Sequence, residues 1–159
     1  MLRLDGDLGG PFDLILGLPV HSLVVHAAVV FIPLAALLSL IAAYKKSFSR
    51  RFGPLILASA VLGQVFSFLA KSSGEPFEER LGIEVERHSE FGETAPLTSL
   101  PMLFLLALLL YVDKSKHANK PVRTVLAVML VFSALGAAGY MYLTGHSGTE
   151  AVWSWVNDI

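Results

Sequence analysis

The side chains best suited to chemistry in this 159-residue sequence are its histidines. His21 and His26 open the first long apolar segment, His88 lies in a polar segment, and His146 follows the last apolar segment in the stretch TGHSG. Imidazole binds metals and haem iron, and an ionisable residue inside a membrane segment usually marks a functional site. We expect these four histidines to gather at one end of the molecule.

Three kinds of chemistry fit such a cluster. The first is a b-type haem whose axial ligands are His26 and His146, with His21 and His88 as a second pair or as supporting residues. The second is a zinc or copper site built from His26, His88, His146 and Glu93, because imidazole suits both metals. The third is a structural or regulatory membrane subunit without a cofactor, whose histidines respond to protons.

Spacing and composition limit these alternatives. His21 and His26 are five residues apart, so they lie about 140° apart around a helix and are poorly placed to bind one compact metal together. The chain contains no cysteine. Disulfides, cysteine-ligated zinc, iron–sulfur clusters and covalent c-type haem attachment are therefore excluded.

The composition predicts the elements that must carry the histidines. The chain is 54% hydrophobic and 16% charged, with a mean hydropathy of +0.63, which is typical of a polytopic membrane protein. Each apolar segment is within or close to the roughly 17–25 residues needed to cross a bilayer. We expect a single all-α domain over residues 1–159, an integral membrane four-helix bundle without an internal repeat. Its spans are residues 20–43, 54–70, 97–112 and 122–144.

Charge predicts how the bundle lies in the membrane. The connections after the first and third apolar segments hold eight of the twelve Lys and Arg residues and one acid, Asp113. The other side holds twelve of the thirteen acids. By the positive-inside rule, the basic side faces the cytoplasm and both termini face outward.

The polar segment between the second and third spans predicts one further helix, over residues 76–91. Phe77, Leu81, Val85 and His88 recur at helical spacing and form one apolar face. We expect an amphipathic helix that lies on the outer membrane surface, with His88 directed toward the bundle.

Four stretches give the sequence a family resemblance over about residues 17–153: GLPVHSLVVHAAVVFIPLA, SGEPFEERL, ERHSEFGET and TGHSGTEAVW. Together they resemble the bacterial membrane proteins grouped as domain of unknown function family 2231. His21, His26, His88 and His146 match the histidines of that family one by one. Ser22 stands where the family often has proline, and TEAVW replaces a common ending; neither difference touches the histidines.

The resemblance implies a location and a role. It implies a multi-pass protein of the bacterial plasma membrane. Members similar to this one occur fused to cytochrome c or Rieske-type domains, which implies electron transfer at the membrane. We therefore expect the lipid bilayer as environment and a quinol or an external redox protein as partner, and no nucleic acid. The sequence predicts neither an oligomeric state nor a catalytic residue.

Overall fold

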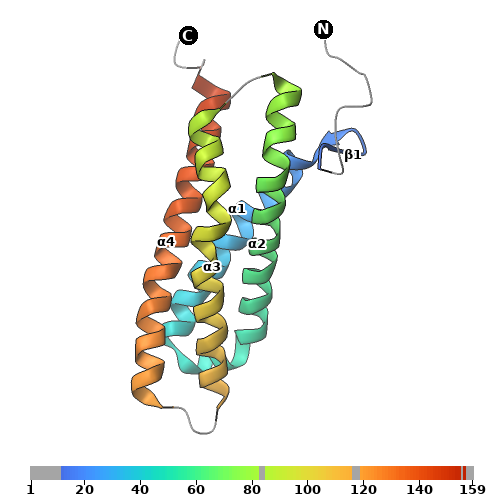
Figure 1. The fold of residues 1–159 in the computed structure, drawn as a ribbon. Coiled ribbons are helices and arrows are strands. Elements are labelled where there is room, and N and C mark those ends of the chain that lie inside the picture. Colours follow the sequence, from blue (N-terminus) through green and yellow to red (C-terminus); the bar gives the residue numbers. More distant parts are fainter. Residues whose placement is uncertain (1–11, 83–84, 116–118, 155, 157–159) are drawn as a thin grey trace.

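Four long helices run up and down the bundle in the computed structural model (Figure 1). The structure describes residues 12–82, 85–115, 119–154 and 156. A two-stranded antiparallel hairpin precedes the bundle, with Leu14 paired to Pro19. The elements in order are β1 (Leu14–Ile15), β2 (Leu18–Pro19), α1 (Val20–Tyr44), α2 (Lys46–Leu81), α3 (Glu86–Lys114) and α4 (Lys120–Trp153).

All four helices are long and apolar enough to cross a membrane, and each contains one of the expected spans. The all-α membrane bundle predicted from the sequence is confirmed. Small side chains such as Ala35, Ala60 and Ala134 fill much of the core and allow the helix backbones to approach closely. Large apolar side chains such as Phe104 and Phe132 point outward, as expected of a surface that faces lipid.

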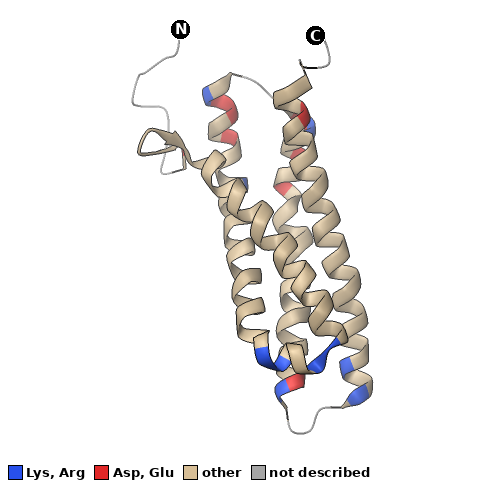
Figure 2. Ribbon diagram, turned by 180° about the vertical axis from the view of Figure 1, so that it is seen from behind, with Lys and Arg blue, Asp and Glu red and all other residues tan. Residues whose placement is uncertain are grey.

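The two ends of the bundle differ in charge. Most acidic residues lie at one end and most Lys and Arg at the other (Figure 2). We call the first the acidic end; it carries the β-hairpin, the C-terminal turns of α2 and α4 and the first turns of α3. The opposite end, where α1 meets α2 and α3 approaches α4, is the basic end.

The prediction of one surface helix over residues 76–91 is wrong. Residues 76–81 continue α2, and residues from Glu86 onward begin α3. Gly82 separates them, because its left-handed backbone (φ 66°) ends α2 and its N–H caps the carbonyl of Glu78. Phe77 and His88 shared one periodic pattern because both face the bundle, although they do so from different helices.

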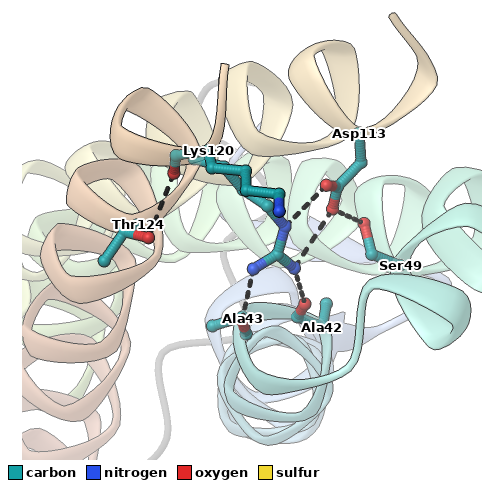
Figure 3. Close-up of polar contacts among 7 residues, drawn as sticks. Ala42, Ala43, Ser49, Asp113, Lys120 and Thr124 are labelled. Carbon is teal, nitrogen blue, oxygen red and sulfur yellow. Dashed lines mark hydrogen bonds and ion pairs between the residues drawn. The ribbon is translucent and has the colours of Figure 1, made fainter. Parts of the chain in front are cut away.

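A buried ion pair joins all four helices at the basic end (Figure 3). Arg123 of α4 donates to both carboxylate oxygens of Asp113 in α3, at 2.7 and 3.4 Å. The Ser49 hydroxyl of α2 donates to the same carboxylate at 2.7 Å. The guanidinium also donates to the carbonyls of Ala42 and Ala43 at the end of α1. The sequence analysis treated Asp113 and Arg123 only as connection charges, so it missed this network.

The bundle is built from two similar helical hairpins, α1–α2 and α3–α4, which the sequence analysis did not detect. An offset of 67 residues, the separation of His21 from His88, maps six buried residues of α1 onto buried residues of α3. An offset of 74 residues relates all five buried residues of α4 to buried residues of α2. Matching pairs include Ala28 and Ala95, Ala42 and Leu109, Ile56 and Leu130, Ala60 and Ala134, and Ser73 and Ser147.

Candidate histidine site at the acidic end of the bundle

His21 is held in the first turn of α1 by the neighbouring helix α2. Its Nδ1 lies 3.0 Å from the carbonyl oxygen of Ala70 and 3.3 Å from the hydroxyl of Ser73. Because the Ser73 hydroxyl donates to the carbonyl of Leu69 at 2.8 Å, its oxygen accepts from the ring. The imidazole therefore carries its proton on Nδ1 and keeps a free lone pair on Nε2. The ring also stacks on Phe77, with centres 5.3 Å apart.

His88 is held in the same way by α4. Its Nδ1 lies 3.0 Å from the carbonyl oxygen of Thr144 and 3.3 Å from the hydroxyl of Ser147. The Ser147 hydroxyl donates to the carbonyl of Thr144 at 2.9 Å, so it too accepts from the ring. Gly148 lets the imidazole lie against the helix, since a Cβ there would be 2.9 Å from the Cε1 of His88.

The two histidines meet where the two hairpins meet. Their ring centres are 6.3 Å apart and their planes cross at 85°. The repeat relates each residue that supports the His21 ring to a residue that supports the His88 ring. The equivalent pairs are Ala70 and Thr144, Ser73 and Ser147, and Gly74 and Gly148.

This spacing fits a metal held between the rings. Two imidazoles that held one metal through facing nitrogens would have ring centres about 6 Å apart, because each nitrogen would lie about 2.0 Å from the metal. A hydrogen bond from the other ring nitrogen to a backbone carbonyl is the usual support of a metal-binding histidine. Both features are present for His21 and His88.

The structure does not place His26 and His146 in this pair. His26 is exposed, and its Nδ1 bonds to the carbonyl of Ser22 in its own helix. His146 is half-exposed, stacks on Tyr142 with centres 5.8 Å apart, and places its Nε2 3.5 Å from the carboxylate of Glu150.

The residues predicted for a zinc or copper site are not brought together either. Within the described ranges, no three His, Asp or Glu residues lie close enough to hold a metal ion. Glu93 is exposed on α3. Of the five predicted site residues, the structure pairs only His21 and His88 through a ring contact.

Two ion pairs flank the site. Arg80 of α2 binds Asp13, and the backbone carbonyl of Asp13 accepts from the N–H of Val20, so the N-terminal segment is fastened next to His21. The hydrogen bond from Arg80 holds the pKa of the Asp13 carboxyl below its usual value. Arg87 of α3 approaches Glu150 of α4 at 3.5 Å. No periodic or motif signal in the sequence marks Asp13.

The fold and the site define an integral membrane four-helix protein with a pair of histidines between two repeated hairpins. The chain matches the family described as "Predicted membrane protein (DUF2231)" over residues 17–156, and it belongs to that family. The resemblance seen in the sequence is thereby confirmed. Comparisons with curated proteins and with solved structures give no match.

Proposed function

We propose that this membrane protein binds one b-type haem between His21 and His88 and transfers electrons at the membrane. The observation that carries the proposal is the pair of rings, 6.3 Å apart and each with Nδ1 bonded to a carbonyl. The haem ligands are thus the pair that the sequence analysis placed second, in place of His26 and His146.

The number of ligands favours haem over a bare metal ion. Zinc takes three or four protein ligands, and no third His, Asp or Glu joins His21 and His88 among the residues described. Haem iron already has four nitrogen ligands from its macrocycle and needs only two axial side chains. A two-histidine site at the junction of two hairpins meets that need.

The same ligand count favours electron transfer over catalysis at the metal. A haem held by both His21 and His88 would have no free position for oxygen or a substrate, so it would supply one-electron redox chemistry. A group held in this way changes its oxidation state without exchanging ligands, and its potential is set by the axial ligands and their surroundings. The partner that donates or accepts the electrons is a quinol or an external redox protein.

A visible spectrum of the purified protein tests the proposal. We expect a Soret band and an alpha band that sharpens on reduction, with one haem per chain. His21→Ala and His88→Ala should each lower haem occupancy at least about tenfold, because each removes an axial ligand. His26→Ala is the matched control and should retain the haem.

Each other outcome contradicts the proposal in a different way. Full occupancy in His21→Ala and His88→Ala, with loss in His26→Ala, would restore the axial pair first expected from the sequence. A colourless protein with stoichiometric zinc or copper would support a metal site. A colourless protein without metal would support a subunit that uses its histidines for structure or regulation.

A further inference from the structure

One part of the acidic end does not follow the repeat. The offset that relates α4 to α2 places His146 opposite Ser72 and Glu150 opposite Pro76. The hairpin α3–α4 therefore carries an imidazole and a carboxylate where the hairpin α1–α2 has neither. Features common to both hairpins support the shared site, so a pair present in only one of them points to a separate role.

His146 and Glu150 line a surface groove between α1 and α4. One part of the groove is lined by Val29, Met141, Tyr142, Gly145, His146 and Thr149. It continues along α4 past His146 to Glu150, Trp153 and Val156. Its walls are mainly apolar and aromatic, and its polar residues are His146, Thr149, Glu150 and Ser154. Tyr142 is 69% exposed on the helix surface, so the groove is open to the lipid phase next to α4.

We propose that this groove binds a quinol, a lipid-soluble ring with hydroxyl groups that carries two electrons and two protons. The assignment rests on the proposed haem site, which receives the electrons. The apolar walls fit the ring and its hydrocarbon tail, and the exposed face of Tyr142 allows stacking. The imidazole of His146 is the hydrogen-bond partner of one quinol hydroxyl, and the carboxylate of Glu150 lies 3.5 Å from its Nε2.

The groove and His88, one of the two proposed haem ligands, lie on opposite sides of α4. His88 rests on the turn of α4 formed by residues 144–148, bonding to Thr144 and Ser147 and touching Gly148. His146 projects from the same turn and lines the groove on its other side. The proposed quinol site and His88 therefore contact the same helical turn of α4.

The chemistry balances with groups at this end of the molecule. Oxidation of the quinol to the quinone breaks two O–H bonds and releases two electrons and two protons. A haem held by His21 and His88 would take up the electrons one at a time, and an external one-electron acceptor would receive them from it. Both protons leave to water at the exposed rim of the groove, next to the side chains of His146 and Glu150, which are about half exposed.

Binding can be measured without the haem. Trp153 lines the groove, so titration with a short-chain ubiquinone analogue should quench tryptophan fluorescence of the full chain in a saturable way. His146→Ala should weaken binding about tenfold, whereas Ser72→Ala, the equivalent position in α2, should leave it unchanged. His146 is half-exposed, so its replacement should not prevent folding. Equal binding of the quinone analogue by wild type and His146→Ala would contradict the proposed quinol site.

Reduction of the haem by the corresponding quinol separates this inference from the proposed function. We expect His146→Ala to slow quinol-driven reduction at least about tenfold, while reduction by dithionite and haem content remain those of Ser72→Ala. If quinol reduces the haem at equal rates in His146→Ala and Ser72→Ala, the proposed quinol site is wrong. The proposed haem site would not be contradicted by that result. A haem-free protein that binds quinone in a His146-dependent way would overturn the haem site and support the groove.

Discussion

At the scale of single residues, two serines decide what the paired histidines can do. Ser73 and Ser147 each donate to a carbonyl of their own helix and accept from a histidine Nδ1. This arrangement fixes both rings in the tautomer that leaves Nε2 free. An interfacial histidine that only anchors the chain needs no such restraint, so the serines favour ligation over anchoring.

Gly148 and Gly74 offer a matched test of this packing. A Cβ at Gly148 would lie 2.9 Å from the Cε1 of His88, whereas one at Gly74 would lie 3.7 Å from the Cε1 of His21, an ordinary contact. We expect Gly148→Ala to displace the His88 ring, lower haem occupancy about tenfold and destabilise the fold by about 1–3 kcal/mol. Gly74→Ala should keep full occupancy and equal or greater stability.

Haem content from the visible spectrum and thermal unfolding by circular dichroism check both variants. If Gly148→Ala and Gly74→Ala lose haem to the same degree, the ring of His88 is not held by close contact with α4. If neither loses any, the close contact between position 148 and His88 has no role in ligation.

The sequence predicted the end of the bundle at which the four histidines lie but not which of them pair. His21, His26, His88 and His146 do lie at the acidic end, as four apolar segments in alternating directions require. Helical spacing places a side chain on one face of its own helix, but it does not say which neighbour that face meets. His21 meets α2 and His88 meets α4, and these tertiary contacts selected the pair.

At the scale of helices, the network around Asp113 fastens the basic end. Asp113 is 1% exposed, so removing its charge leaves the partly buried Arg123 near carbonyls without its anion. We expect Asp113→Asn to lower the free energy of unfolding by about 3 kcal/mol. Ser49→Ala removes one hydrogen bond and should cost about 1 kcal/mol.

Unfolding by SDS titration in detergent micelles measures these differences. Lys114→Ala, next to Asp113 but exposed, is the control and should change the free energy by less than about 0.5 kcal/mol. Equal effects of Asp113→Asn and Lys114→Ala would show that the network does not hold the helices together. Haem content should not change in any of the three, because the site lies at the other end of the bundle.

Helix boundaries near the site were harder to predict than the spans. The spans follow from apolar length alone, which the bilayer imposes. The sequence predicts one helix over residues 76–91 because its apolar residues keep a helical period. One left-handed glycine, Gly82, divides that pattern between α2 and α3, and periodicity carries no information about such a break.

At the scale of the whole molecule, the repeat explains why one site forms between two hairpins. The repeat escaped sequence analysis because equivalent core positions differ in size, as Ala35 and Met102 or Ala42 and Leu109 do. What the two hairpins share is the pattern of buried positions and one histidine supported by one serine. Two such halves facing each other bring two supported histidines together, a pair that neither half provides alone.

The cysteine-free chain allows a direct test of how this assembly lies in the membrane. Glu86→Cys places a thiol at the acidic end, and Ser47→Cys places one at the basic end; both positions are exposed. The positive-inside rule predicts that an impermeant maleimide labels Glu86→Cys in intact cells but Ser47→Cys only after permeabilisation. The parent chain, which has no thiol, gives the background.

The labelling result also tests on which side of the membrane the proposed haem would pass its electrons to an acceptor. His21 and His88 lie at the same end as Glu86, so labelling of Glu86→Cys from outside places the histidine pair near the outer face of the membrane. An external redox protein can then accept the electrons that a quinol supplies from the lipid phase. The opposite labelling pattern would place the pair at the cytoplasmic face, contradict the positive-inside prediction and require an acceptor in the cytoplasm.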